Sequence, residues 1–279
     1  MTTTTPDADK PVPPPPPPPA PAAQITATAT ATATAEPKRV RVRTTLPALP
    51  LPPSASRPPI RTARLVLRPA SAADLAAVHA LRAQPAVMAR TAAGRPDRDL
   101  QETRAFLDRF LPPRDADTFN FVVLLLREDG EGEGEGELIG TGGMHRIGSG
   151  EGSGSKTGWP EVGYLFKQRH WGRGYATEFL RACVDAWWAL PREERELEVD
   201  EASVAGLGWD DGAGGDGEVR RVPERVTAMV EEGNPNSANV LRKVGFAEFK
   251  RWTEPDSREG CGQRDVTLIA LSATAPPGR

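Results

Sequence analysis

A short stretch rich in glycine and basic side chains, Arg169-His170-Trp171-Gly172-Arg173-Gly174, follows a strand-like run and precedes an amphipathic helix. Gly172 and Gly174 lack a Cβ atom, so the backbone there can turn tightly and approach a ligand closely. The free N–H groups at the start of the next helix, together with the positive end of its dipole, favour a phosphate. Arg169 and Arg173 add positive charge nearby. The stretch predicts a phosphate-binding loop, with an ordinary surface turn as the alternative.

The elements on either side of this loop have clear hydrophobic periods. Residues 162–166 alternate as a strand requires, with Val162, Tyr164 and Phe166 on one face. The helix after the loop carries apolar residues at the i, i+3, i+4, i+7, i+8 and i+11 positions of one face. These residues are Ala176, Phe179, Leu180, Cys183, Val184 and Trp187, and core packing is therefore expected for the cysteine. The loop has neither G-x-G-x-x-G nor a closing Gly-Lys-Ser/Thr, which excludes the dinucleotide fingerprint and the P-loop.

A second segment with residues of chemical interest covers 234–246. Asn234 or Asn236 suits a helix cap, and Pro235 suits the first turn. Gly245 fits the left-handed position that follows the end of a helix. The segment therefore predicts a short capped helix that ends in a tight turn.

The R-x-x-G-x-G loop resembles the pyrophosphate loop of the GCN5-related N-acetyltransferases (GNAT family), which binds the diphosphate of acetyl-coenzyme A. Segment 234–246 resembles the family's N-x-x-S…K-x-G-F segment, and a strand at 226–230 separates the two motifs in the expected order. TARLVLRP at 62–69 and EVGYLFKQRHWGRGYATE at 161–178 look most like the RimJ/RimL-type branch, which includes ribosomal-protein and other N-terminal acetyltransferases. The resemblance covers about residues 60–272, interrupted by inserts.

This resemblance implies a mixed α/β (α+β) GNAT fold: a bent, mostly antiparallel mixed sheet with one parallel splay and helices on both faces. Acetyl-CoA, the acetyl donor substrate, is implied to lie in the splay and to pair with backbone groups of roughly residues 164–167. One backbone N–H polarises the thioester carbonyl, and an N–H aimed at a developing oxyanion contributes about 3 kcal/mol. The residues implied to bind acetyl-CoA are Leu165, Phe166, Lys167, Arg169, His170, Trp171, Gly172, Arg173, Gly174, Tyr175, Ala176 and Asn234.

Acetyl transfer to an amine needs a base for the amine and an acid for the departing thiolate. The family often has a carboxylate on the strand before the loop, which points to Glu161 as the base. A surface or ion-paired glutamate is the alternative, and Glu102 is a weaker substitute. Many members carry a tyrosine seven residues after the motif asparagine, but Leu241 stands at that position here. Ser237 matches a serine used in part of the RimJ/RimL-type branch and is the candidate acid, although a hydrogen-bonding role at the helix start explains it equally.

The resemblance implies N-acetylation of a primary amine by direct attack on the bound thioester. The acceptor is expected to be a protein N-terminus, by analogy with the branch, or a small amine. An N-terminal α-amine, with a pKa near about 8, needs less help from a base than a lysine amine near about 10.4. Contacts to the acceptor are expected around residues 86–104 and the final strand, 265–271. Arg90, Arg95 and Arg104 would meet an acidic or phosphorylated acceptor, unless they are solvated surface residues.

Two alternatives belong to other classes of protein. A catalytically silent acyl-CoA-binding module would keep the loop without the chemistry, and Leu241 leaves this open. An interaction protein would use its proline-rich tail to recruit a partner. The run Pro13–Pro19 is expected to form an extended polyproline II helix, which is either a ligand for an SH3- or WW-type domain or a solvated spacer.

Residues 1–57 consist mainly of Thr, Ala and Pro and cannot bury enough apolar surface to offset the entropy of ordering, so a disordered tail is predicted. No apolar segment resembles a secretory signal or is long enough to span a membrane. A cytoplasmic location is expected, while the basic segment 38–43 leaves a nuclear one open. The net charge of −3 argues against a nucleic-acid partner.

Residues 58–272 are predicted to form one acetyltransferase domain, followed by a tail at 273–279. Low-complexity inserts at 128–137, 148–158 and 191–223 are predicted to be mobile surface loops. The two cysteines indicate a reducing compartment without a disulfide framework. The three histidines are scattered and neither cysteine has a metal-ligand neighbour at useful spacing, so no metal is expected.

Overall fold

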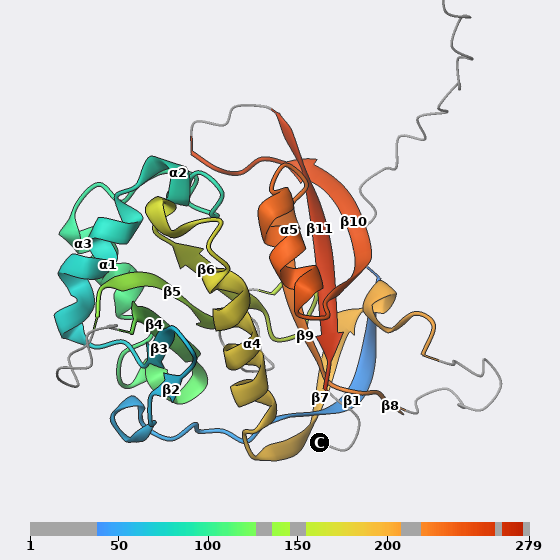
Figure 1. Cartoon of the computed structure of the whole chain (residues 1–279). Coiled ribbons are helices and arrows are strands. Elements are labelled where there is room, and N and C mark those ends of the chain that lie inside the picture. Colours follow the sequence, from blue (N-terminus) through green and yellow to red (C-terminus); the bar gives the residue numbers. More distant parts are fainter. Residues whose placement is uncertain (1–37, 127–135, 146–154, 208–218, 260–263, 276–279) are drawn as a thin grey trace, which may run out of the picture. The chain divides into compact units, whose positions relative to one another are not determined.

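Two antiparallel sheets meet at one parallel bridge and then diverge, and this splay organises the fold (Figure 1). The computed structural model describes residues 38–126, 136–145, 155–207, 219–259 and 264–275. All of them belong to one unit that begins at Glu36. None of the helices in these ranges combines the length and hydrophobicity that crossing a bilayer requires.

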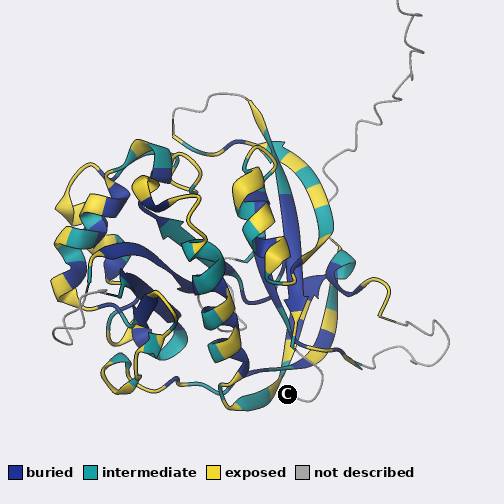
Figure 2. Ribbon diagram, viewed as in Figure 1, coloured by how far each residue is buried: buried dark blue, intermediate teal, exposed yellow. Residues whose placement is uncertain are grey.

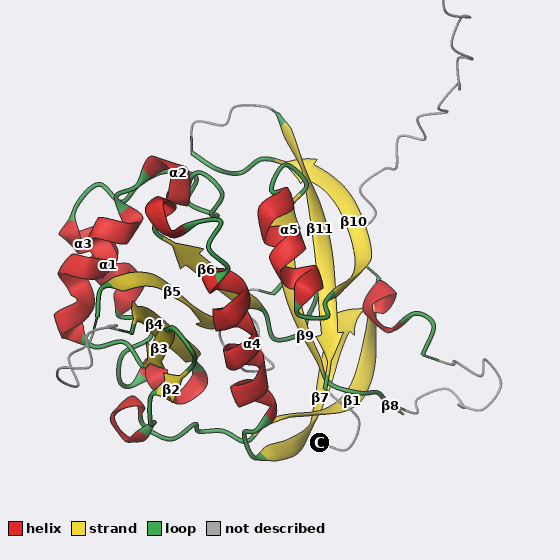
Figure 3. Cartoon of the chain, in the orientation of Figure 1, coloured by secondary structure: helices red, strands yellow, loops and turns green. Residues whose placement is uncertain are grey.

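The larger sheet has five antiparallel strands in the order β2-β3-β4-β5-β6. They are β2 (Ile60–Arg61), β3 (Leu65–Arg68), β4 (Phe119–Leu125), β5 (Leu138–Met144) and β6 (Val162–Phe166). Helices α1 (Leu75–Arg82), α2 (Pro85–Met88) and α3 (Leu100–Leu107) gather on one side of this sheet (Figure 3). Val78 of α1 and Leu107 of α3 share a buried cluster with Val122 and Leu124 of β4, so these helices cover that face.

The second sheet has three antiparallel strands in the order β10-β11-β9. They are β9 (Arg225–Glu231), β10 (Ala247–Pro255) and β11 (Asp265–Thr274). In Figure 2, β11 is buried over residues 269–273, whereas the edge strand β10 carries only exposed and half-buried residues.

Helices α4 (Tyr175–Trp188) and α5 (Pro235–Lys243) join the two sheets through one hydrophobic core. Phe179 and Cys183 of α4 are completely buried, as the predicted apolar face requires. Gly142 of β5 lets α4 pack closely, because a Cβ atom there would lie 2.7 Å from the Phe179 ring. Asn234, one of the two predicted candidates, caps α5, and Gly245 beyond it has a left-handed φ of 94°.

A third sheet contains β7 (Arg192–Asp200), β1 (Arg39–Pro47) and β8 (Arg220–Arg221), in the order β7-β1-β8. The disordered tail predicted for 1–57 is therefore wrong for β1, and the mobile loop predicted for 191–223 is wrong for β7 and β8. Residues 1–37, which include Pro13–Pro19, lie outside the described residues. The domain thus extends upstream of the predicted boundary at 58.

The physical reason for this correction is a matched pattern in two distant segments. Arg-Val-Arg-Val-Arg in β1 and Glu-Leu-Glu-Val-Asp in β7 both have the period of two that a strand requires. Opposite charges pair across the strands, since Arg41 Nη2 and Arg43 Nη2 lie 2.7 and 3.0 Å from the Glu196 carboxylate. The average composition of the tail concealed this pattern.

The other predicted inserts are described only in part. Only Gly136 and Glu137 of insert 128–137, and residues 155–158 of insert 148–158, fall within the described ranges. β11 continues to Thr274, so the domain also includes the first two residues of the predicted tail at 273–279.

Candidate active site

Strands β6 and β9 lie side by side for one parallel bridge, between Glu161 and Thr227, and then separate. The Thr227 N–H donates to the Pro160 carbonyl over 2.8 Å. Beyond the bridge, the described residues of β6 pair with β5 and those of β9 pair with β11. The facing edges of β6 and β9 therefore carry backbone groups without a strand partner, and such groups require hydrogen bonds from elsewhere.

The pairing of β6 with β5 decides which of its residues face the splay. The His145 N–H donates to the Glu161 carbonyl over 2.9 Å, and the Lys167 N–H donates to the Ile139 carbonyl over 2.8 Å. Residues of an antiparallel strand alternate between bonding toward a neighbour and away from it. The even-numbered residues of β6 therefore direct their backbone groups toward the splay.

Tyr164 and Phe166 are the two such residues next to the loop. The Phe166 carbonyl is taken up by the Trp171 indole N–H over 2.7 Å. The Tyr164 N–H and carbonyl and the Phe166 N–H remain directed into the splay. Of the backbone groups expected between 164 and 167, those of Leu165 and Lys167 instead face β5.

The loop between β6 and α4 is a short 3-10 turn, Gln168–His170, followed by two left-handed glycines. Gly172 has a φ of 74° and Gly174 has a φ of 82°, a region that favours glycine. A Cβ atom on Gly172 would meet nothing within 4 Å, so the backbone there borders open space. Gly174 is the N-cap of α4 and provides no capping side chain, which leaves N–H groups of the first turn for another partner.

Three basic residues of the predicted loop converge on one carboxylate, that of Glu137 just before β5. Lys167 Nζ lies 2.9 Å from one of its oxygens, and Arg169 forms a second ion pair with it. His170 Nε2 lies 3.3 Å from the other oxygen, and burial lowers the pKa of His170. Burial acts to raise the pKa of Glu137, but hydrogen bonds and charge from Lys167 and Arg169 outweigh it and hold that pKa below its usual value. These side chains are thus already paired, while Trp171 is 46% exposed.

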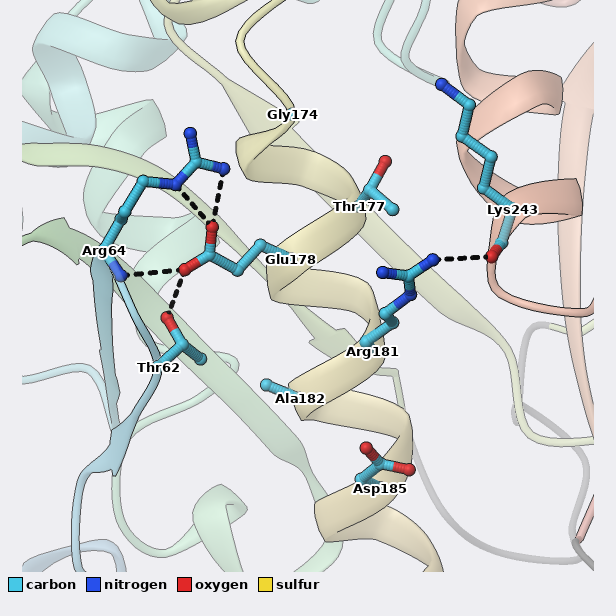
Figure 4. Close-up of a pocket in the computed structure, with 9 residues that line it drawn as sticks. All are labelled: Thr62, Arg64, Gly174, Thr177, Glu178, Arg181, Ala182, Asp185 and Lys243. Atoms are coloured by element: carbon cyan, nitrogen blue, oxygen red, sulfur yellow. Dashed lines mark hydrogen bonds and ion pairs between the residues drawn. The ribbon is translucent and has the colours of Figure 1, made fainter.

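An open pocket of about 570 Å³ runs along the outer face of α4 beside Gly174 (Figure 4). The Glu178 carboxylate accepts hydrogen bonds from Thr62 Oγ1 at 2.7 Å, Arg64 N at 2.9 Å and Arg64 Nε at 2.7 Å. The Arg64 guanidinium also lies 4.6 Å from the centre of the Tyr175 ring and donates to the Arg173 carbonyl. Strand β3 and the loop are thereby tied together. The residues that line the pocket are Thr62, Arg64, Gly174, Thr177, Glu178, Arg181, Ala182, Asp185 and Lys243.

Sequence reasoning did not assign Arg64, Arg181 or Lys243 to the site. A signal for Arg181 was present, because it lies on the polar face of α4 that continues from Gly174 through Glu178. Arg181 Nη2 donates to the Lys243 carbonyl over 3.2 Å, which joins α4 to the end of α5. Only the folded arrangement brings Arg64 and Lys243 to this helix.

Tyr164 and Ser237 connect the two sides of the splay. The Tyr164 hydroxyl lies 2.9 Å from Ser237 Oγ, and burial raises the pKa of Tyr164. The Ser237 N–H donates to Asn234 Oδ1 over 3.3 Å, so the asparagine side chain serves as the helix cap. Leu241 is fully buried in the core. Tyr164 therefore stands beside Ser237, the predicted acid.

Glu161 directly precedes β6, on the face opposite Tyr164, and pairs with His145, which directly follows β5. Its side chain is half-buried, and burial raises the pKa of the Glu161 carboxyl to about 7 against the opposing charge of Lys156. Within the described residues, this carboxyl group has no ion-pair partner. A carboxyl group that titrates near neutral pH is suited to proton transfer.

The remaining candidates near the predicted acceptor region are engaged with one another. Hydrogen bonds from Arg95 and the Arg98 N–H lower the pKa of Glu102 to about 2, which makes it a poor base. Arg95 also contacts Glu259 on the segment after β10, over 2.5 Å. Arg90 Nη1 donates to the Gly233 carbonyl over 2.6 Å, whereas Arg104 lies exposed on α3.

Comparison with known proteins identifies the class that this fold and site define. A sequence model of the Acetyltransferase (GNAT) domain matches residues 64–247, which is more than half of the chain. The chain therefore belongs to the GNAT acetyltransferase family. Among curated proteins, uncharacterized protein YkkB of Bacillus subtilis is 28% identical over 98 residues, which cover 34% of this chain and 40% of YkkB. The match thus spans less than half the length of that relative.

Two solved structures share the fold. A probable GNAT-family acetyltransferase from Chromobacterium violaceum has a TM-score of 0.53 at 17% identity, covering 82% of this chain and 89% of its own. The microcin C7 self-immunity acetyltransferase MccE, in complex with acetyl-CoA and AMP, has a TM-score of 0.51 at 10% identity, covering 77% and 94%. The predicted GNAT fold is confirmed. Within the described ranges, no cluster of three or more His, Cys, Asp and Glu side chains resembles a metal site.

Proposed function

We propose that this protein is an acetyl-CoA-dependent N-acetyltransferase that moves an acetyl group to a primary amine by direct attack on the thioester. The observation that carries the proposal is the open backbone edge of β6, which leads directly into a glycine loop at the uncapped start of α4. These groups match a donor with an extended amide-containing arm and a diphosphate. The related fold of MccE was solved with acetyl-CoA.

Acetyl-CoA supplies the acyl group, and the residues of this chain hold it. We assign the arm to the splay-facing groups of Tyr164 and Phe166. The diphosphate is assigned to the backbone from Gly172 to Ala176, with Arg173 as the nearby cation. The pocket of Figure 4 then receives the nucleotide end between Arg64, Arg181 and Lys243. The loop is also stabilised by the contacts of Lys167, Arg169 and His170 with the Glu137 carboxylate, so these side chains hold the loop and do not bind the donor directly.

Proton transfers are assigned to two groups on opposite faces of β6. Glu161 takes a proton from the ammonium form of the acceptor, and the free amine attacks the thioester carbonyl. The carbon–sulfur bond breaks, and the Ser237 hydroxyl, hydrogen-bonded to Tyr164, gives a proton to the departing sulfur. The attacking nitrogen loses its second proton as the amide forms, and that proton restores the hydroxyl. The Tyr164–Ser237 pair provides a hydroxyl where Leu241 provides none, which favours an active enzyme over a silent acyl-CoA-binding module.

We infer that the acceptor is a protein N-terminus or a small amine, in line with a RimJ/RimL-type relationship. A base with a pKa of about 7 suits an α-amine near about 8 far better than a lysine amine near about 10.4. Arg90 and Arg95 already have partners, so they would have to exchange them to bind an acidic acceptor. Transfer to peptides with a free N-terminus, to N-blocked lysine peptides and to polyamines would distinguish these acceptors.

The test of the cofactor site is calorimetric titration of acetyl-CoA into the full chain and into Gly174→Glu. The glutamate adds bulk and negative charge where the diphosphate is assigned, so affinity should fall at least about 100-fold. Gly206→Glu is the matched control, because Gly206 has a φ of 78° and open space around it but lies after β7. No heat at millimolar acetyl-CoA would overturn the proposal, and equal binding by both variants would remove the loop from the site.

A further inference from the structure

The sheet β7-β1-β8 borders the segment that leads into Glu161 (Figure 1). We propose that this sheet positions Glu161 and shields its carboxyl group from water, with Trp159 as the positioning residue that transmits the constraint. The proposal deepens the proposed function, since it rests on Glu161 as the base.

Trp159 belongs to the core of this sheet. It is 1% exposed and clusters with Val42 and Leu46 of β1 and Leu197 and Val199 of β7. This cluster is separate from the core beneath α4 and α5. An aromatic residue two positions before Glu161 is thus held by strands that lie outside the splay.

Two constraints hold the indole ring of Trp159: its burial and a hydrogen bond. The Trp159 Nε1 donates to Ser203 Oγ over 2.7 Å, and Ser203 Oγ donates in turn to the Asp200 carbonyl over 2.6 Å. Asp200 is the last residue of β7, so the ring is anchored to the end of that strand. A buried polar pair of this kind specifies one orientation.

The chain between Trp159 and Glu161 is held from both sides. The Asp200 N–H donates to the Thr157 carbonyl over 2.9 Å, which ties the segment to β7. On the other side, Thr157 Oγ1 lies 3.0 Å from Thr227 Oγ1 of β9, and the Thr227 N–H donates to the Pro160 carbonyl. The position at which β6 enters the splay therefore depends on the third sheet as well as on β9.

Gly158 shows how closely the segment and β7 approach. A Cβ atom there would lie 2.1 Å from the Glu198 carbonyl oxygen, and its φ is 79°. Any side chain would have to move β7 away, so the backbones are in direct contact. This contact leaves no room for water between Gly158 and the Glu198–Val199 backbone of β7.

Charges around Glu161 come from the elements packed against it. Lys156 on the preceding segment forms an ion pair with Glu254 of β10, and Lys250 of β10 forms one with Asp200 of β7. Directly after β5, burial and the charge of Arg109 lower the pKa of His145 to about 4, so it is neutral at pH 7. Lys156, the lysine whose charge acts on Glu161, is paired with Glu254, and burial then has the larger effect on the Glu161 carboxyl.

The test is a 13C NMR titration of the side-chain carboxyl groups in the full chain, with Glu161→Gln to assign the Glu161 signal. The unmodified protein should show that carboxyl titrating near pH 7. Trp159→Phe removes ring volume and the bond to Ser203, so water should enter and the midpoint should fall by about one pH unit or more. Ser203→Ala retains the ring and should give a smaller downward shift.

Trp187→Phe is the matched control. Trp187 is also fully buried and donates its indole N–H to a side chain, that of Glu224 over 2.8 Å, but it belongs to the core under α4. This variant should lose comparable thermal stability without moving the Glu161 midpoint. Equal shifts in both tryptophan variants, or an unmodified midpoint near about 4.3, would overturn the proposal.

Failure of the proposed function would look different. If Glu161→Gln transfers acetyl groups as fast as the unmodified protein, Glu161 is not the base. The NMR midpoints in the tryptophan variants would still decide whether the third sheet shields Glu161, because that measurement needs no acceptor and no acetyl-CoA.

Discussion

The two ends of β6 are held by different kinds of interaction. At its C-terminal end, the loop is fixed by charge and by glycine geometry, with Lys167, Arg169 and His170 on Glu137 and two left-handed glycines before α4. At its N-terminal end, Trp159 is fixed by an apolar core that the third sheet builds. The strand between these ends carries the splay-facing groups and Glu161.

This difference separates binding from proton transfer. In the proposed function, the polar end presents backbone N–H groups to an anion, and it tolerates water because the ligand itself is charged. In the same proposal, the apolar end keeps the pKa of the Glu161 carboxyl near neutral, which requires that water is excluded from it. Changes at one end should therefore alter affinity for acetyl-CoA, and changes at the other should alter turnover and its pH dependence.

The largest expected effect comes from deleting residues 1–57, which removes β1. Loss of the burial of Val42 and Leu46 costs about 3–6 kcal/mol, which corresponds to a fall in Tm of about 10 °C or more. Transfer should fall at least about 100-fold. Deletion of 1–37 leaves β1 intact and should change neither quantity. Calorimetry and initial rates measure both, and full transfer by the longer deletion would show that β1 is not needed for turnover.

Glu161→Gln should lower kcat/KM about 100-fold and remove the fall in rate as the pH drops through about 7. The same substitution should raise stability above neutral pH, although it lowers the rate. Because burial raises the folded-state pKa of Glu161, the unmodified protein loses stability as the pH rises from about 4.5 to about 7. The variant should therefore have the higher Tm at pH 8 and no such gain at pH 4. A uniform change in Tm at both pH values would contradict this.

Ser237→Ala should lower kcat about 10-fold while acetyl-CoA affinity stays within about threefold, because the hydroxyl acts on the departing sulfur. Tyr164→Phe removes the partner hydroxyl and tests the same pair. Asn239→Ala, on the same helix but exposed, serves as control. Rates and affinities measured together separate effects on turnover from effects on acetyl-CoA binding. Unchanged kcat in both variants would show that the Tyr164–Ser237 pair has no part in catalysis.

The smallest expected effect is that of Glu137→Gln. Backbone hydrogen bonds within the loop, such as His170 N–H to the Lys167 carbonyl at 2.9 Å, should preserve its shape. One negative charge is removed beside a polyanionic ligand, so acetyl-CoA should bind about threefold to tenfold more tightly at low salt, and the gain should vanish at high salt. Glu196→Gln makes the same charge change on β7 and should leave affinity unaltered. Weaker binding at every salt concentration would mean that Glu137 mainly orders the loop.

Sequence reasoning succeeded where a local pattern has one structural meaning. The apolar stripe of α4, the cap at Asn234 or Asn236 and the left-handed Gly245 each follow from a few neighbouring residues. It failed for β1, because Arg39–Pro47 becomes a strand only through Arg192–Asp200, a segment whose own composition looked like a loop. The ion pairs of Glu137 and the Arg64–Glu178 contact could not be predicted from the sequence either, since each joins residues that only the tertiary fold brings together.

The pairing of β1 with β7 also bears on how the chain reaches its folded state. Arg39 and the Glu198 carbonyl that it contacts are 159 positions apart, so β1 leaves the ribosome long before its partner exists. Contacts of such sequence separation form slowly. The buried cluster around Trp159 can therefore form only after β7 has been synthesised, and a nascent chain that stops short of Asp200 cannot form it.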